Sequence, residues 1–481
     1  MPEHQQTVDV SALTARIARL IDAGRIGAAK PLLLALRRIA PPSPLLTLLA
    51  ARLAAREGRL DLAQSELDAA ITATPDHAEL RKCRAELRQQ TGDKAGAAAD
   101  AAEAVVLNRR DPSAKALLGV LLLELGRATD AVTCLSEAVA ADPAHPAYRE
   151  GLGAAQQAAG DAEAAMATLS AGIAATPGSA ALRNAATLLA VSQRDFNGAT
   201  RLAEQACSDG VADACLFGLK GHALSSLGRH AEAADAYAEA LKLGPNDPYV
   251  RHMVSAAGKL PTVERAHIDY VRTVFDGYSN HFDAHLISLG YRIPGLIHAA
   301  LLQHPAIQSG EHLGPALDLG CGTGLTAVAL SDLPIGPITG VDVSSRMLAQ
   351  AATKQLYAEL READLVQVLA EDTGIWPLIL AADVLCYLGD LRDVFDRVYQ
   401  RLDAKGWFVC SVEELLPDRD GTIQGNCEWA LHRQGRYAHA RDYVMKVALE
   451  TGFAVKRLER QTIRYEANAP VDGIFAVLER A

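Results

Sequence analysis

Hydrophobic and polar positions follow different patterns in the two halves of this 481-residue chain. Residues 1–249 are saturated with Ala and Leu, both strong helix formers, and we expect this half to be helical. Beyond a short break at Leu260-Pro261, β-rich runs alternate with helical stretches of roughly 10–15 residues. This alternation predicts βαβ units, and therefore a mostly parallel sheet with helices on both faces. The predicted strands span residues 316–319, 337–341, 360–364, 378–382, 407–412, 454–460 and 473–478.

A 34-residue period runs through the helical half. Each period carries a turn-type residue, an alanine five residues later and, in most periods, a proline twelve residues after that alanine. The turn-type positions are Gly24, Gly58, Gly92, Gly126, Gly160, Arg194 and Gly228. Each unit is therefore predicted to be a helix, a tight turn, a second helix and a stop at proline. Small residues also recur at Gly119, Gly153 and Gly221, where the two helices of a hairpin must approach closely.

These positions resemble the tetratricopeptide repeat, and seven consecutive units cover roughly residues 9–248. The resemblance implies a right-handed, all-α solenoid in which each repeat buries one face against the next. It also implies a groove that binds a partner protein or peptide, while a scaffold without a site of its own is the alternative. We expect the solenoid in residues 1–250, a linker or capping segment in 251–261 and a second domain in 262–481.

Composition restricts the compartment and the kinds of partner. The net charge of −11, with 47 basic and 58 acidic side chains and no Lys/Arg run, opposes a nucleic-acid-binding surface. No apolar stretch reaches about 18 residues, which predicts no membrane span. Eight scattered cysteines without a CxxC pair predict neither a disulfide framework nor a metal site. Since the N terminus lacks the pattern of a secretory signal, we expect a cytoplasmic protein without membrane or nucleic-acid partners.

The motif that carries chemistry is ALDLGCGTG, residues 316–324, a predicted buried strand that runs into a loop with glycines at 320, 322 and 324. Glycines there let a ligand lie against bare backbone and let the next helix pack on the strand. The spacing is GxGxG, whereas a dinucleotide fingerprint needs GxGxxG and a nucleotide-triphosphate loop needs a following Gly-Lys-Ser/Thr. Asp318 fits a cationic α-amino group better than a pyrophosphate. Asp342 ends the second predicted strand, where a carboxylate can take both hydroxyls of a ribose.

The glycine loop and the two acids resemble the class I S-adenosylmethionine-dependent methyltransferases over roughly residues 262–481. The resemblance implies a doubly wound, seven-stranded, Rossmann-like α/β domain with S-adenosylmethionine as its cofactor. Together with the repeats and the segments FDxY…FDxHL, LxAADVLxYLGDL and GRYAH, the chain is similar to a bacterial group of predicted methyltransferases that carry tetratricopeptide repeats.

The resemblance also implies how the methionine and ribose parts of the cofactor are held. The methionine part would be held by Asp318 and by the backbone of the loop glycines Gly320, Gly322 and Gly324. The ribose falls to Asp342, for which a helix N-cap is the alternative role. Asp383, at the end of the fourth predicted strand, is implied to line the mouth shared by cofactor and substrate.

The adenine is implied to lie between residues that follow the second and third strands. Val343 and Met347 would pack against the ring, and Asp364, next to Leu365, would accept a hydrogen bond from the adenine amino group. A simple strand-end turn is the alternative for Asp364, because the acidic pair Glu371-Asp372 offers a competing register.

Residues 275–291 resemble the lid helices that precede the first strand in small-molecule methyltransferases. Tyr278, Phe282 and His285 are spaced by 4 and 3 and so share one helical face. That face is predicted to close over the cofactor, with Tyr278 and His285 as contacts. Ordinary packing of an amphipathic helix is the alternative.

A general base is needed only if the methyl acceptor must lose a proton. The candidates at the carboxyl edge of the sheet are Tyr387, Glu413, His432, Tyr437 and His439. For the two histidines, a surface or core imidazole is the competing interpretation. Cys321 lacks a histidine partner that would make it a nucleophile.

The sequence therefore predicts a methyltransferase that transfers a methyl group in line to an unidentified acceptor, either a protein side chain or a small metabolite. One alternative is a repeat scaffold whose second domain only binds cofactor or is inactive. A nicotinamide-dependent reductase is a third possibility, which the glycine spacing disfavours.

Overall fold

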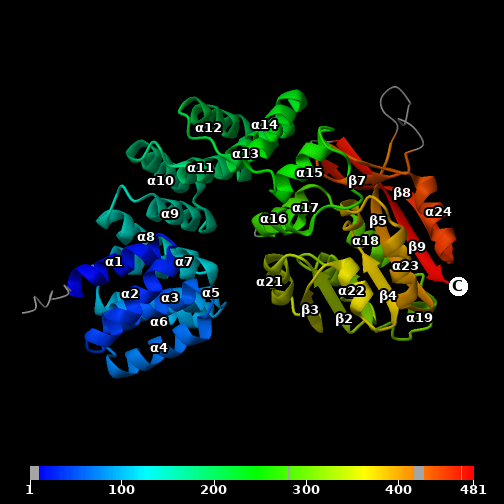
Figure 1. Cartoon of the computed structure of the whole chain (residues 1–481). Coiled ribbons are helices and arrows are strands. Elements are labelled where there is room, and N and C mark those ends of the chain that lie inside the picture. The colour runs from blue at the N-terminus through cyan, green and yellow to red at the C-terminus, as the bar shows by residue number, and fades with distance from the viewer. Residues whose placement is uncertain (1–9, 280–281, 417–426, 467–468) are drawn as a thin grey trace, which may run out of the picture. The chain divides into compact units, whose positions relative to one another are not determined.

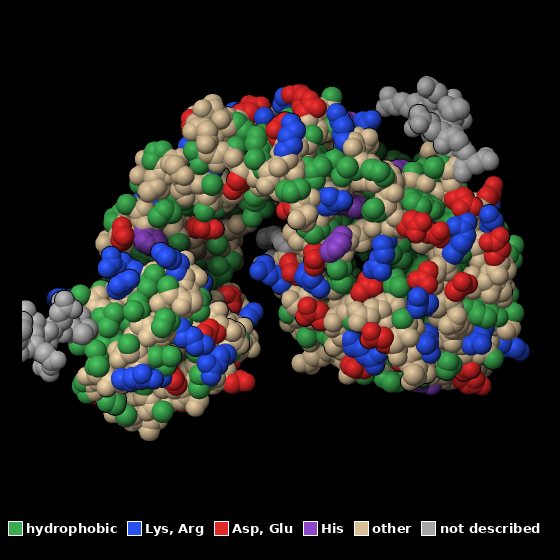
Figure 2. All heavy atoms as spheres, viewed as in Figure 1, with side chains coloured by type: hydrophobic (Ala, Val, Ile, Leu, Met, Phe, Trp, Pro, Cys, Tyr) green, Lys and Arg blue, Asp and Glu red, His purple; other side chains and the backbone are tan. Residues whose placement is uncertain are grey.

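The structure, a computed structural model, describes residues 10–279, 282–416, 427–466 and 469–481. The chain forms two compact units, Met1–Ala223 and Leu224–Ala481 (Figure 1). Among the described residues, no helix is both long and apolar enough to cross a membrane. On the face of the second unit that Figure 2 shows, basic and acidic side chains are interspersed rather than gathered by sign.

The first unit is built from consecutive helical hairpins (Figure 1). Its helices are α1 (Val10–Asp22), α2 (Ile26–Ile39), α3 (Pro44–Arg56), α4 (Leu60–Ala73), α5 (Ala78–Gln90), α6 (Lys94–Leu107), α7 (Pro112–Glu124), α8 (Ala128–Ala141), α9 (Pro146–Ala158), α10 (Ala162–Ala175), α11 (Ala180–Ser192) and α12 (Phe196–Ser208). Helix α13 (Ala214–Ser226) spans the border, and α14 (His230–Leu243) and α15 (Pro248–Ala256) belong to the second unit. The predicted order of helix, turn and helix is confirmed in every repeat.

The turn residues predicted from the 34-residue period all have left-handed backbones. Their φ values run from 59° at Arg194 to 88° at Gly160, and glycine adopts this region without the cost that a Cβ brings. The small residues of the hairpins are also where the sequence predicts them. A Cβ on Gly153 would lie 2.9 Å from Leu169, so α9 and α10 approach too closely for any larger residue.

Arginine fixes the end of several repeats, a feature that sequence analysis missed. Six residues after a repeat-ending proline, an arginine side chain donates to the carbonyl oxygen of that proline. The pairs are Arg81 with Pro75, Arg149 with Pro143, Arg183 with Pro177 and Arg251 with Pro245. Each bond satisfies a carbonyl in the loop that follows a helix.

The second unit contains a nine-stranded sheet. Strands β3 (Glu359–Glu362), β2 (Ile338–Asp342), β1 (Ala316–Leu319), β4 (Trp376–Ala381) and β5 (Leu402–Glu414) lie side by side and are parallel. Antiparallel β9 (Ala469–Arg480) pairs with β5, and β8 (Phe453–Glu466) pairs with β9. The far end of β5 also pairs with β7 (Tyr437–His439), which pairs with β6 (Trp429–Leu431).

Both faces of the sheet are buried by helices. On one face, Leu317, Ile379 and Phe408 share a core with α22 (Leu365–Glu371), α23 (Arg392–Arg401) and α24 (Arg441–Thr451). On the other face, the alternate residues Leu378 and Val409 pack with α18 (Ile293–Leu301) and α20 (Leu325–Ala329). The unit also contains α16 (Ile268–Tyr278), α17 (Phe282–Ser288), α19 (Pro305–Gln308), α21 (Ser345–Thr353) and a 3₁₀ turn at Leu385–Tyr387.

The doubly wound fold and its seven predicted strands are confirmed, with two differences. Sequence analysis missed β6 and β7, which are too short for a hydrophobic pattern to reveal. The third strand ends at Glu362 rather than at 364, because Asp364 already caps helix α22.

Helix α15 packs against the α/β domain. His252 Nε2 lies 2.9 Å from the carbonyl oxygen of Gly435, and its ring lies 4.0 Å from that of Tyr270 in α16. The compact unit therefore starts earlier than the predicted domain at residue 262.

Candidate functional site

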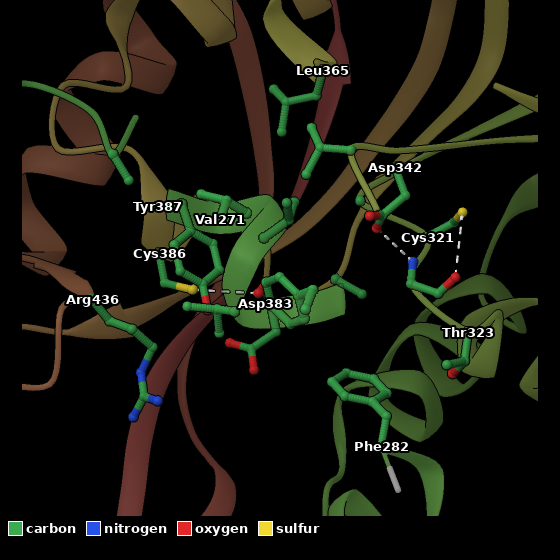
Figure 3. Close-up of a pocket in the computed structure, with 18 of the residues that line it drawn as sticks. Val271, Phe282, Cys321, Thr323, Asp342, Leu365, Asp383, Cys386, Tyr387 and Arg436 are labelled. Carbon is green, nitrogen blue, oxygen red and sulfur yellow. Dashed lines mark hydrogen bonds between the residues drawn. The ribbon is translucent and has the colours of Figure 1, made fainter. Parts of the chain in front are cut away.

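A cavity of about 260 Å³ opens at the carboxyl ends of β1, β2 and β4 (Figure 3). Parallel strands bring their carboxyl ends to one edge of the sheet, so the loops that follow them form a common wall. The opposite wall comes from α16 and α17, which contribute Val271, Phe275, Phe282, His285 and Leu286. This is the edge at which the sequence places the cofactor.

The glycine loop gives the cavity a wall of bare backbone. Gly320 and Gly322 have φ values of 67° and 54°, a region that favours glycine. A Cβ on Gly320 would lie 2.3 Å from the side chain of Val384, while one on Gly322 would point across the cavity toward Phe282, 3.8 Å away. Any side chain on the loop would strain it or fill the space beside it.

Asp342 ties the end of β2 to the glycine loop. Its Oδ2 accepts a hydrogen bond from the Gly322 N–H at 2.9 Å, and its Oδ1 accepts one from the Ser344 N–H at 2.9 Å. The cap of the following helix is Ser344, whose Oγ accepts from Met347 N. The helix-cap alternative for Asp342 is therefore wrong. Burial raises the pKa of Asp342, although the backbone donors oppose this.

The predicted adenine side is partly assembled. Val343, Asp364 and Leu365 line the cavity. Asp364 Oδ1 accepts from the backbone of Val366 and Gln367 at the start of α22, while Oδ2 pairs with Arg265. Asp364 is thus a helix cap as well as part of the wall. The competing acidic pair at 371–372 lies at the other end of α22 and does not line the cavity.

Three predicted residues do not reach the cavity wall, which corrects the sequence analysis. Asp318 is fully buried, and its Oδ2 accepts from the Tyr357 hydroxyl at 2.7 Å. Burial raises the pKa of Asp318 to about 7. Met347 is fully buried in the protein interior, and Gly324 starts α20 against Tyr357. The side chains of Asp318 and Met347 and the Cα atom of Gly324 therefore lie behind the glycine loop and support it.

Helices α16 and α17 form the predicted cover. Phe282 and His285 line the cavity, and the side chain of Tyr278 lies outside the described part of the chain. Asp276 Oδ1 accepts from Ser344 Oγ at 2.6 Å. Asp283 pairs with Lys354 at 2.8 Å and also accepts from Thr323. Two carboxylates thus fasten the cover to the loops that follow β1 and β2.

Of the five base candidates, only Tyr387 lines the cavity. His439 is fully buried with Nε2 at 2.9 Å from the Leu388 carbonyl oxygen, and burial lowers its pKa to about 4. Tyr437 is fully buried and donates to the Val263 carbonyl oxygen. His432 lies in the turn between β6 and β7. His439 and Tyr437, offered by the sequence as candidate bases, are therefore structural, and His432 does not line the cavity.

Sequence analysis missed a group of charged side chains in the wall. Arg436, Arg464 and Glu466 line the cavity beside Asp383, and Glu413 lies behind them. The segment GRYAH around Arg436 was noticed, but only the pairing of β5, β8 and β9 brings these charges together. The available signal was the presence of Arg464 and Glu466 in a strand of the sheet, because charged residues buried in a sheet need partners of opposite charge.

Comparison with known proteins assigns both parts of the chain. Residues 317–408 match the methyltransferase domain family, and residues 48–115, 116–180 and 185–248 match the tetratricopeptide repeat. The human methyltransferase-like protein 27 is 34% identical over 144 residues, which is 30% of this chain and 56% of the human protein. The match therefore spans only about half of that relative.

Solved structures resemble each half separately. A tetratricopeptide repeat protein from Parabacteroides merdae is 18% identical, with a TM-score of 0.41, 52% of this chain and 98% of that chain covered. The magnesium protoporphyrin IX methyltransferase of Synechocystis PCC 6803, solved with bound S-adenosylhomocysteine, is 16% identical, with a TM-score of 0.33 and coverages of 44% and 99%. By the family matches, the chain contains a methyltransferase domain together with N-terminal tetratricopeptide repeats. The two expected domain types are confirmed.

Proposed function

We propose that this protein transfers a methyl group from S-adenosylmethionine to an acceptor at the mouth of the cavity, and that the repeats recruit the partner or substrate protein. The observation that carries the first part is the join between Asp342 and the glycine loop. This hydrogen bond places the Asp342 carboxylate next to the exposed backbone of the glycine loop, at the carboxyl edge of the sheet.

The residues present suit the cofactor. Gly322 leaves room for a ligand against the backbone, whereas Gly320 lets the loop pack closely on Val384. Asp342 offers carboxylate oxygens for ribose hydroxyls, and Val343 and Leu365 offer apolar surface for a purine ring. Such a cavity, mostly apolar with a few fixed polar groups, is typical of a small-molecule site.

The chain has to bind the cofactor, orient it toward the methyl acceptor and keep water out of the cavity. When bound, S-adenosylmethionine supplies a methyl group that is already activated on a sulfonium. Orientation alone can then lower much of the barrier. Phe275 packs against both Phe282 and Tyr387, with ring centroids 6.0 Å and 5.6 Å apart, so the aromatic side chains from α16 and α17 cover the reacting region. Excluding water in this way also strengthens the electrostatic contacts inside.

Tyr387 is suited to donate a proton in a hydrogen bond rather than to remove one. Burial raises the pKa of its phenol well above the usual value, so the hydroxyl stays protonated near neutral pH. An acceptor that must lose a proton would therefore need a carboxylate of the wall rather than this tyrosine. An acceptor that carries no such proton needs neither group.

Recruitment by the repeats rests on the family match and on the regular stacking of the hairpins. Incubating the chain with methyl-labelled S-adenosylmethionine and cell extract, with and without residues 1–223, would test it. Recruitment predicts that labelling of the acceptor falls when the repeats are removed. Equal labelling would restrict function to the second unit.

Titration calorimetry on the full chain tests the methyltransferase proposal. We expect S-adenosylmethionine and S-adenosylhomocysteine to bind with micromolar dissociation constants, about 8 kcal/mol of binding free energy. NAD should not bind, because the glycine spacing does not suit a pyrophosphate. NAD binding as tight as that of S-adenosylmethionine would contradict the proposal. Cofactor binding without labelling of any acceptor would favour the inactive-module alternative.

A further inference from the structure

Five charged side chains form one network in the cavity wall and directly behind it, here named the charged cluster: Asp383, Glu413, Arg436, Arg464 and Glu466. Arg464 lies at its centre, 2.9 Å from Asp383 and 2.8 Å from Glu466, and also pairs with Glu413. Arg436 lies 2.6 Å from Glu413 and 2.8 Å from Glu466. The side chain of Arg464 is only 4% exposed and that of Glu413 only 8%.

The charges of the cluster do not cancel. Three carboxylates face two guanidinium groups, which leaves one negative charge when all five are ionised. A buried charge without a counter-charge is costly, because it has lost its hydration. A ligand that brings one positive charge into the cavity would balance the charged cluster.

Among the carboxylates of the wall, Asp383 is the one with a buried oxygen that accepts no hydrogen bond from the described residues. Asp342 and Asp364 have donors on both oxygens. Glu466 receives both arginines on Oε1 and is 33% exposed to solvent. Asp383 Oδ2 is held by Arg464, whereas its buried Oδ1 has no hydrogen-bond partner among the described residues.

The backbone holds Asp383 in an unusual position. Its φ is 55°, a region that a non-glycine residue adopts at a cost, and its N–H donates to Ser411 Oγ at 2.9 Å. Figure 3 shows its carboxylate extending from the end of β4 into the space between Arg436 and Phe282. Gly320 packs against Val384, the next residue, so this carboxylate and the glycine loop belong to the same end of the cavity.

We propose that Asp383, rather than Asp318, binds the α-ammonium group of S-adenosylmethionine. The inference rests on the proposed function and assigns one part of its ligand. An ammonium donates hydrogen bonds and would place a positive charge directly beside the carboxylate of Asp383. Asp318 is fully buried behind the loop, is absent from the wall and is already bonded to Tyr357.

Calorimetric titration of the full chain with three probes tests this assignment. S-adenosylhomocysteine carries the ammonium without the sulfonium, S-adenosylmethionine carries both, and 5′-methylthioadenosine carries neither. The variants are Asp383→Asn, and Asp318→Asn as the matched control. Because position 383 has a left-handed backbone, Asp383→Gly is the second variant, which removes the carboxylate and relieves the backbone cost.

We expect Asp383→Asn and Asp383→Gly to weaken both S-adenosylhomocysteine and S-adenosylmethionine by about ten- to a hundredfold, the usual loss of a charged hydrogen bond. Binding of 5′-methylthioadenosine should stay within about twofold, which also shows that the pocket is folded, and Asp318→Asn should preserve the preference for the amino-acid probes. Loss confined to S-adenosylmethionine would point to the sulfonium and overturn the inference. Unchanged binding, or an equal loss for all three probes, would also overturn it.

The two proposals fail in different ways. If the wild-type chain binds neither S-adenosylmethionine nor S-adenosylhomocysteine, the proposed function is wrong and this inference is lost with it. If the wild type binds both and the Asp383 variants bind them equally well, only the inference is wrong.

Discussion

The hydroxyl of Tyr357 donates a hydrogen bond of 2.7 Å to Asp318, a carboxylate that is completely buried beneath the glycine loop. The bond joins the turn before β3 to the carboxyl half of β1. It satisfies one oxygen of Asp318, while the other has no partner among the described residues. The first acid of the motif therefore lies behind the loop, and the carboxylates that line the cavity follow the neighbouring strands.

This environment predicts a pH dependence of stability. Burial disfavours the charged form of Asp318 and raises its pKa from an ordinary 3.8 to about 7 in the folded chain. The stabilising contribution of a raised carboxyl pKa is present below the unfolded pKa and is lost as pH rises through the folded one. As pH rises from 4 to 7, the ionisation of Asp318 should therefore lower the free energy of unfolding by up to about 4 kcal/mol.

Urea unfolding of the wild type and Asp318→Asn at several pH values measures this effect. The variant should gain stability relative to the wild type as pH rises from about 4 to about 7. A constant difference across that range would mean that Asp318 titrates normally. Comparing differences between pH values removes any fixed cost of the substitution.

The turn at Arg194 predicts a stabilising substitution. Arg194 has the left-handed φ of 59° that glycine adopts in the other repeats. Arg194→Gly should raise the unfolding free energy of the first unit by up to about 1 kcal/mol, since backbone strain is relieved. The matched change Gly160→Ala, at φ 88° and with open space around a Cβ, should lower it by about 1 kcal/mol. Denaturation followed by helical circular dichroism tests both, and equal signs would contradict the prediction.

The contacts of α15 predict where the second unit begins. A fragment of residues 224–481 should bind S-adenosylhomocysteine as the full chain does, because it keeps the whole compact unit. A fragment of residues 262–481 lacks α15, with its buried Val250, Met253 and Val254, and should be less stable by at least about 3 kcal/mol. Equal melting temperatures for the two fragments would support residue 262, the position predicted from sequence, as the start of the second domain.

The repeats and the glycine loop were predictable because each rests on local geometry. A left-handed turn every 34 residues needs glycine, and a close hairpin contact such as that of Gly153 needs a small residue. Asp342 was predictable for a similar reason, since it ends a strand at a fixed distance from the loop. These positions are determined by a few neighbouring residues, so the sequence displays them directly.

The charged part of the wall was not predictable from local pattern. Arg464 meets Asp383 and Glu413 only because β8, β9, β5 and β4 lie in a particular order. His439, for which a core imidazole was the competing interpretation, and Tyr437 were candidate bases because of their place in the sheet. They lie on a short strand at the correct sheet edge, but their polar atoms bond to backbone carbonyl groups in the interior.

The affinity and melting temperature of Asp342→Ala test the central claim most directly. The substitution removes the proposed acceptor of both ribose hydroxyls, each such bond being worth roughly 1.5–3 kcal/mol, and it also frees the Gly322 N–H. The account predicts that S-adenosylhomocysteine binds on the order of a hundredfold more weakly, a loss of about 3 kcal/mol, while the variant remains folded. Affinity equal to that of the wild type, with only a lower melting temperature, would remove Asp342 from the site and contradict the account.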